Sequence, residues 1–228
     1  MATAADTGRI FLMYSSLASH QNDLHNAFAW IEFAYKEGNS LLEAAKRRLA
    51  DEAALKFFAT GTCNTYKRSV SHRYTWLDVD WYISESDERP ERALFVAMSY
   101  SSEDRVGCYL ILGVCDLDRS GSALIDKPTQ LGHWLIDYAV NSSSSPGKFL
   151  VRERSDGLFE YTPGVALEPG YRIGLHRIIS APFAVAWIDS ETKLSAIVHA
   201  LVTFFTGAET DELGRHCREA RAALAENT

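Results

Sequence analysis

Two helical patterns open the chain. Over residues 21–37 the apolar side chains recur at spacings that place them on one face of a helix. These side chains are Leu24, Phe28, Ile31 and Tyr35. Gly38 predicts the end of this helix, and Ser40 with Glu43 forms a capping box that starts a second one, which apolar spacing extends to near Gly61. The sequence therefore predicts an N-terminal helical hairpin.

After the helices the apolar period changes to two. Over residues 75–84 the odd positions are mostly apolar, which is typical of a half-buried strand with one polar face. The even positions are Trp76, Asp78, Asp80, Tyr82 and Ser84. Residues 92–100 and 105–115 are more uniformly apolar and predict central strands. Short connections rich in turn residues favour an antiparallel meander for these three strands.

Residues 148–162 predict a hairpin around Gly157. A two-residue loop would place Glu153 opposite Glu160, whereas a three-residue loop would place Arg152 opposite Glu160. Like charges directly opposite one another destabilise a strand pair. We therefore expect the three-residue loop, with Gly157 in the left-handed conformation.

The remaining pattern alternates strands and helices. It predicts a helix that begins near Asp126, strands near 171–179 and 183–189, a helix over 191–206, and a last helix over about 210–225. The helix over 191–206 is apolar on nearly all sides, which is typical of a helix buried in a core or an interface. The fold class we expect is α+β, with an antiparallel sheet of six to eight strands, the N-terminal helical hairpin and two C-terminal helices.

The clearest linker in the chain is the run Asn-Ser-Ser-Ser-Ser-Pro-Gly over 141–147. It predicts either one exposed loop or a break between sub-domains. We expect a single α+β domain over 1–228, because the part after the linker is too small to bury a comfortable core by itself.

Composition and charge exclude several classes of protein. The chain has 228 residues, of which 46% are hydrophobic and 23% charged, with a net charge of −7. These values are ordinary for a globular protein, and the acidic balance argues against a general nucleic-acid coat protein. The longest apolar run, Cys108 to Cys115, is far shorter than the roughly 20 residues that span a bilayer. With four cysteines and no CxxC motif, we expect a cytoplasmic protein that does not contact membranes.

The first functional hypothesis is a binding or regulatory protein without catalysis, which recognises a protein partner or a small ligand. Trp76 and Tyr82 suggest that the even face of their strand is more than a solvated surface, since bare solvent faces rarely carry two large aromatic rings. Lys67, Arg68 and Arg73 precede this strand and add a basic stretch interleaved with aromatic residues. We therefore expect these five residues to contact the ligand or partner. Nucleic acid is a less favoured partner, and a homo-oligomer such as a homodimer is the expected assembly.

The alternative hypothesis is a metal-dependent phosphoryl-transfer enzyme or nuclease. Asp78 and Asp80 lie on the same face of one predicted strand, and Asp116 and Asp118 form a second pair. Brought together, these carboxylates would bind Mg²⁺ or Mn²⁺, with Asp78, Asp80 and Asp116 as the catalytic residues. The basic residues named above would steer the phosphate. The sequence contains no known nucleotide-binding or hydrolase motif, and the first hypothesis implies no particular cofactor.

Overall fold

The structure is a computed structural model. It describes residues 21–64, 76–86, 91–100, 108–117, 147, 149–166, 174–207 and 211–225. The chain divides into two units, Met1–Glu37 and Gly38–Thr228, and the sheet belongs to the second. The predicted helix near Asp126 and the linker residues 141–146 lie outside the described residues.

One continuous helix, α2 (Gln21–Ala50), replaces the predicted helical hairpin. The helix runs through Gly38, since one glycine inside a helix costs only about 1 kcal/mol. Burial of the side chains that follow it, Leu42, Ala45 and Leu49, outweighs that cost. The prediction that a second helix continues to Gly61 is also wrong, because residues 55–64 form a strand instead.

The described residues form a seven-stranded antiparallel sheet, which confirms the α+β class and the expected strand number. The strands are β1 (Leu55–Asn64), β2 (Trp76–Ser84), β3 (Arg92–Tyr100), β4 (Cys108–Leu117), β5 (Phe149–Glu153), β6 (Phe159–Pro163) and β7 (Leu175–Ala184). Their order across the sheet is β1-β2-β3-β4-β7-β6-β5. The meander β2 to β4 was predicted, but the sequence did not show that β1 precedes it, or that β7 pairs with β4 and leaves β5 at an edge.

The hairpin β5–β6 has the predicted register. Arg152 lies opposite Glu160, and their side chains form an ion pair of 3.2 Å between Nη2 and Oε2. Gly157 has a φ of 89°, the left-handed conformation that the three-residue loop requires. The three-residue loop, expected because it avoids placing Glu153 opposite Glu160, is therefore confirmed.

β7 replaces the two strands predicted near 171–179 and 183–189. The strand continues through Pro182, which lacks a backbone N–H, because β6 pairs only with Ile178, Ile179 and Ser180. Beyond Ser180 no ladder partner on that side needs the missing donor. A short 3-10 helix, Val185–Trp187, follows the strand.

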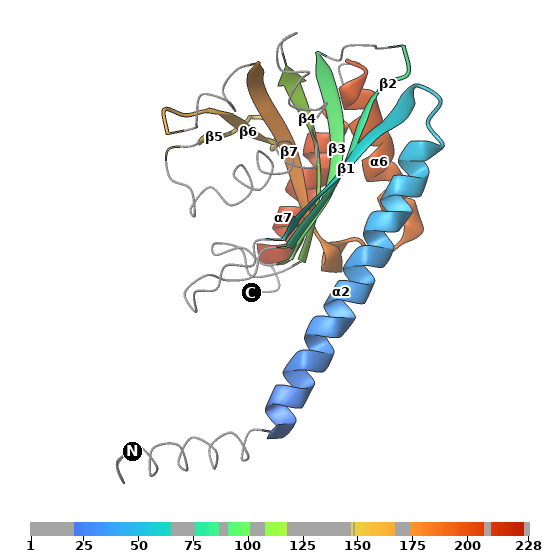
Figure 1. Cartoon of the computed structure of the whole chain (residues 1–228), viewed down its shortest axis with the longest axis vertical. Coiled ribbons are helices and arrows are strands. Elements are labelled where there is room, and N and C mark those ends of the chain that lie inside the picture. The colour runs from blue at the N-terminus through green and yellow to red at the C-terminus, as the bar shows by residue number, and fades with distance from the viewer. Residues whose placement is uncertain are drawn as a thin grey trace, which may run out of the picture. The chain divides into compact units, whose positions relative to one another are not determined.

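The two faces of the sheet are both buried. One face contacts α6 (Glu191–Phe205) and α7 (Glu212–Ala225), the two predicted C-terminal helices, which lie behind the sheet in Figure 1. Its core side chains are Leu94, Val96, Met98, Leu110, Leu112 and Val114. On the opposite face, the rings of Trp81 and Phe95 contact each other at a tilt of 53°, with centroids 5.5 Å apart, in a second apolar cluster. The apolar surface of α6 is thus part of the core, as one of the two alternatives predicted.

No helix among the described residues is both long enough and apolar enough to cross a bilayer.

Gly113→Ala should strongly destabilise the protein. A Cβ at position 113 would lie 2.4 Å from the Ile179 carbonyl oxygen and 2.5 Å from Cζ of Phe95, so backbone and ring must both move. We expect a loss of about 2 to 3 kcal/mol in the free energy of unfolding, measured by urea denaturation. As a control, Gly207→Ala has open space and only an unfavourable φ, and should cost about 1 kcal/mol. Equal losses in the two variants would contradict the close packing of β3, β4 and β7.

Candidate functional site

The strand that carries most of the predicted site residues is present, as β2. Asp80 and Tyr82 face the helix-covered side of the sheet, and their exposed fractions are only 6% and 2%. Lys46 on α2 lies over them, with Nζ 3.2 Å from Oδ2 of Asp80. The exposure that the sequence alternation predicted is therefore absent at these two residues. Trp76 and Asp78 belong to β2, but their side chains lie outside the described part, as do residues Lys67, Arg68, Arg73 and Asp118.

Asp80 and Asp116 do not come together. The register places Asp80 level with Leu112, four residues from Asp116 on a strand two positions away. The backbone positions of Asp80 and Asp116 are therefore separated by about 10 Å across the sheet and about 13 Å along it, which is a distance of about 16 Å. Among the described residues no group of three or more His, Cys, Asp or Glu side chains is arranged to hold a metal ion. Asp116 instead pairs with two arginines, Nε of Arg92 at 3.1 Å and Nε of Arg177 at 2.5 Å.

Burial and charge perturb the groups around Asp80. Burial lowers the pKa of Lys46, but the neighbouring carboxylates of Glu43 and Asp80 outweigh that effect, so its pKa is raised. For Tyr82, burial and the charge of Asp80 act together and raise the pKa of the phenol well above its usual range. Lys46 and Asp80 therefore form a partly buried ion pair that holds the part of α2 after Gly38 on the sheet.

Tyr82→Phe should reduce the loss of stability that the protein suffers at high pH. In the unfolded chain a tyrosine ionises near its ordinary pKa of 10.0, whereas Tyr82 stays protonated in the fold. A raised folded pKa gives stability that is complete below the unfolded pKa and declines as pH rises above it. Removal of the phenol should flatten this decline by up to about 1.4 kcal/mol per pH unit. Urea denaturation of both proteins between about pH 9 and pH 12 measures the slopes; parallel slopes would contradict the burial of Tyr82.

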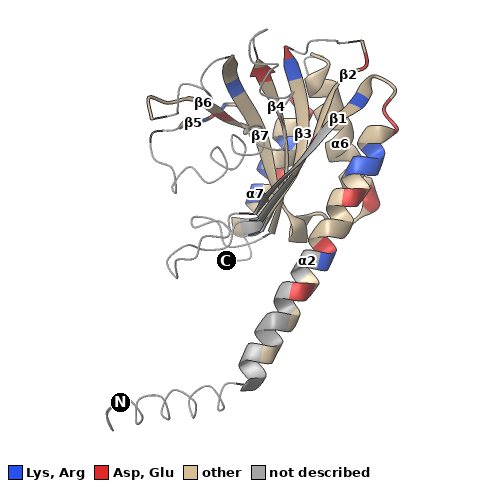
Figure 2. Ribbon diagram, in the orientation of Figure 1, with Lys and Arg blue, Asp and Glu red and all other residues tan. Residues whose placement is uncertain are grey.

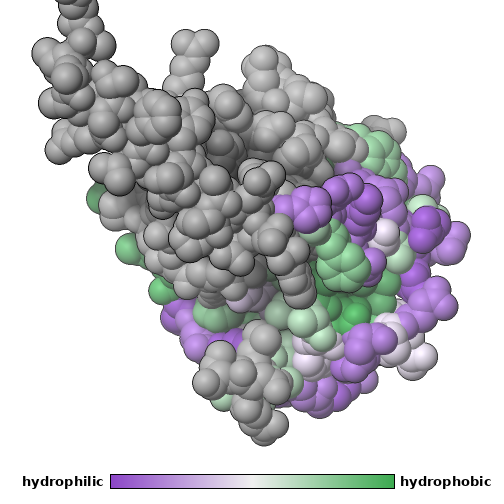
Figure 3. Space-filling model, turned by 90° about the horizontal axis from the view of Figure 1, so that it is seen from below, coloured by the Kyte–Doolittle hydropathy of each residue, from purple (hydrophilic) through white to green (hydrophobic). Residues whose placement is uncertain are grey.

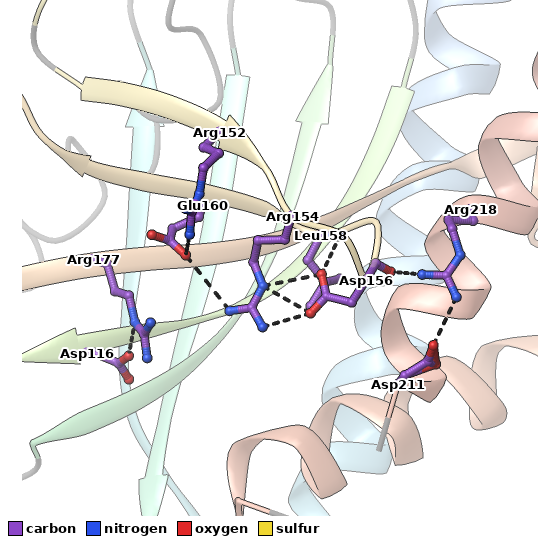
Figure 4. Close-up of polar contacts among 9 residues, drawn as sticks. All are labelled: Asp116, Arg152, Arg154, Asp156, Leu158, Glu160, Arg177, Asp211 and Arg218. Carbon is purple, nitrogen blue, oxygen red and sulfur yellow. Dashed lines mark hydrogen bonds and ion pairs between the residues drawn. The ribbon is translucent and has the colours of Figure 1, made fainter. Parts of the chain in front are cut away.

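A network of ion pairs joins the β5–β6 hairpin to the rest of the unit (Figure 4). Arg154 contacts both carboxylate oxygens of Asp156, with Nη2 2.7 Å from Oδ2. Asp156 also accepts a hydrogen bond from the backbone N–H of Leu158 at 3.1 Å. Arg218 on α7 donates to the backbone carbonyl of Asp156 and pairs with Asp211 at 3.1 Å. The hairpin turn is thus held to α7 by side-chain contacts at the turn itself.

The charged residues of β3, β4 and β7 lie near the ends of these strands, and others lie at turns and on helix surfaces (Figure 2). Arg92, the first residue of β3, is one example of a charged residue at a strand end. Burial lowers the pKa of its guanidinium, and Asp116 partly offsets the shift. Its Nη1 donates to the carbonyl of Phe205 at 3.2 Å, and its guanidinium lies 5.3 Å from the ring centroid of Phe204. These contacts join β3 to the end of α6. Asp116 therefore has a structural role as the ion-pair partner of Arg92.

Two of the five large exposed apolar side chains among the described residues lie on β5, and a third follows β6. Leu150 and Val151 of β5 are 65% and 45% exposed, and Val165 beyond β6 is 89% exposed. Seen from below, the described surface shows hydrophobic groups beside hydrophilic ones (Figure 3). Because Leu150 and Val151 are successive residues of a strand, they expose apolar surface on both faces of the sheet.

The backbone of β5 also presents hydrogen-bonding groups at the sheet edge. The N–H of Arg154 donates to the carbonyl of Leu158 at 2.8 Å. This bond sets the ladder phase, that is, which residues of β5 direct their backbone groups toward β6. In an antiparallel pair such residues alternate, so Leu150 and Arg152 face β6. The N–H and C=O groups of Val151 and Glu153 therefore point away from the sheet. Together with the exposed side chains, they make β5 the candidate binding site.

Sequence reasoning missed this site, although it predicted the hairpin that contains it. The signal in the sequence is the apolar triplet Phe149-Leu150-Val151 beside a turn. Within it Phe149 is buried, and Leu150 and Val151 are exposed because β7, not β5, pairs with β4.

The chain matches no family model, no curated protein and no solved structure.

Asp116→Ala should destabilise the fold through the arginines that it leaves behind. Arg92 is partly buried, and without the carboxylate its charge loses a close partner. We expect a loss of about 1 to 3 kcal/mol in the free energy of unfolding. Arg152→Ala is the control, because the exposed pair between Arg152 and Glu160 should contribute less than about 1 kcal/mol. Thermal and urea denaturation compare the two, and equal stabilities would contradict a structural role for Asp116.

Proposed function

We propose that this protein is a cytoplasmic binding protein that recognises another polypeptide by adding an extended segment to the edge of its sheet at β5, without catalysis. The observation that carries the proposal is the combination of exposed Leu150 and Val151 with the outward backbone groups of Val151 and Glu153. The described cysteines, Cys108, Cys115 and Cys217, form no disulfide, which fits a reducing compartment.

An uncovered apolar edge strand is a hazard that soluble proteins usually block with charge, proline or a bulge. β5 has none of these at Leu150 and Val151. Its charged residues, Arg152 and Glu153, are engaged by Glu160 and Arg221 at 3.2 and 2.8 Å. An added strand would satisfy the backbone groups and cover apolar side chains on both faces, which is how strand addition gives affinity and specificity.

The hairpin is also held in place before binding. Arg154 and Arg218 fix the turn at Asp156, and Arg221 donates to the carbonyl of Gly157 at 3.4 Å. A preorganised edge loses less conformational entropy when a partner binds. Asp80 and Asp116, the described residues of the metal hypothesis, are instead neutralised by basic side chains and lie far apart. The binding hypothesis is therefore the better supported of the two.

Val151→Pro tests the proposal directly. Proline removes the outward N–H of Val151 but leaves the inner ladder to β6 intact, because Leu150 and Arg152 make that ladder. Val151→Ala is the matched control, since it also shortens the side chain but keeps the amide. Loss of one hydrogen bond should weaken binding by about 1 kcal/mol, or about fivefold.

The probe is a displayed library of extended seven-residue peptides, selected against the wild-type chain and then measured by fluorescence anisotropy. Peptides that bind Val151→Ala more tightly than Val151→Pro support strand addition at β5. The proposal fails if selected peptides bind both variants equally, or if the chain is monomeric and no peptide is selected. Circular dichroism of both variants verifies that each remains folded.

A further inference from the structure

We infer that the polypeptide added at β5 is a second copy of this chain, so that two β5 strands pair antiparallel around a two-fold axis at Val151. The inference rests on the proposed function of the same edge and names its partner. It would join two sheets into one continuous sheet and cover Leu150 and Val151 in both copies. Three features of the described residues support it: the ladder phase, the charge sequence of β5, and the shape of the opposite edge.

The ladder phase limits the ways in which two copies can pair. Phe149, Val151 and Glu153 direct their backbone groups outward. In an antiparallel pair, outward residues of one strand must lie opposite outward residues of the other. The two-fold axis must therefore pass through a residue of β5 and not between two residues.

Charge then selects one residue. An axis at Arg152 or Glu153 would place identical charges opposite each other, and an axis at Leu150 would pair only three of the five residues of β5. An axis at Phe149 would engage only the first half of the strand. With the axis at Val151 all five residues of β5 are paired, and within the strand no like charges lie opposite each other.

The side chains in this register are complementary. Val151 lies opposite Val151 of the second copy, and Leu150 lies opposite Arg152 of the second copy on the helix-covered face. The aliphatic part of an arginine side chain covers apolar surface well while its guanidinium stays in water. The pairing therefore removes exposed leucine and valine surface from water without burying an unpaired charge.

The other edge of the sheet is less suited to such pairing. In β1 the register shifts between Phe57 and Ala59, which marks a bulge or an irregularity in the strand. A bulge interrupts the row of outward backbone groups and discourages pairing with another strand. Phe57 is exposed there, but its ring contacts Tyr82 edge-on, with centroids 5.9 Å apart. We therefore assign self-association to β5.

Cysteine cross-linking tests the register. At the axis, the two copies of residue 151 form a hydrogen-bonded pair with Cα atoms about 5.5 Å apart, within disulfide range. Val151→Cys should therefore form a disulfide-linked dimer under mild oxidation, seen on a non-reducing gel. Leu150→Cys and Arg152→Cys should each cross-link poorly alone but form a mixed dimer when combined. The wild-type chain is the control for the natural cysteines, of which Cys115 and Cys217 are buried and Cys108 has its pKa raised to about 12 by burial.

Light scattering with the proline variant provides a second measurement. The pair of Val151 residues at the axis contributes two N–H donors, so Val151→Pro should weaken the dimer about thirtyfold, against about fivefold for a bound peptide. The expected result is a wild-type and a Val151→Ala dimer, with Val151→Pro largely monomeric at the same concentration.

The outcomes separate this inference from the proposed function. A wild-type monomer whose β5 still binds selected peptides in a Val151-dependent manner would overturn the second copy as partner and leave strand addition standing. A dimer that Val151→Pro does not weaken, or efficient cross-linking of Leu150→Cys alone, would overturn the register and the assignment to β5. A monomer that binds no extended peptide would overturn both proposals.

Discussion

The pairing of β4 with β7 is the constraint on which the rest of the structure depends. It joins Cys108–Leu117 to Leu175–Ala184, two strands that are far apart along the chain, and nine residue pairs hold the join. Without it the meander β1 to β4 and the meander β5 to β7 would be two small sheets, each with unsatisfied edges. With it, α6 and α7 contact one continuous apolar face, and β5 becomes an edge strand.

The close packing at this join explains a glycine. Gly113 lies between Phe95 of β3 and Ser180 of β7, and the ring of Phe95 occupies the space that a side chain would need. A flat aromatic ring over a glycine brings three strands together with little empty volume. The charged contacts have a different role: Asp116 with its two arginines, and Asp156 with Arg154 and Arg218, fix the periphery of the sheet and the hairpin turn.

Much of the fold could be predicted from local sequence, because period and turn chemistry are local properties. The alternation before Ser84, the register of Arg152 with Glu160 and the bounds of the C-terminal helices all depend on neighbours within a few residues. Predictions failed where packing overrides a local signal. Gly38 predicts a helix end, but the burial of Leu42 and Leu49 carries the helix through it. The candidate site could not be predicted, because the exposure of Leu150 depends on strand order.

The order of the strands also has a consequence for how the chain is made. During synthesis β4 leaves the ribosome before β7 has been translated, so one of its two neighbours in the finished sheet does not yet exist. Contacts between distant parts of a sequence form slowly, and an unpaired apolar strand invites association with other nascent chains. The pairing of β4 with β7 at the centre of this sheet is therefore the last part to form. It is also the part that most needs protection during synthesis.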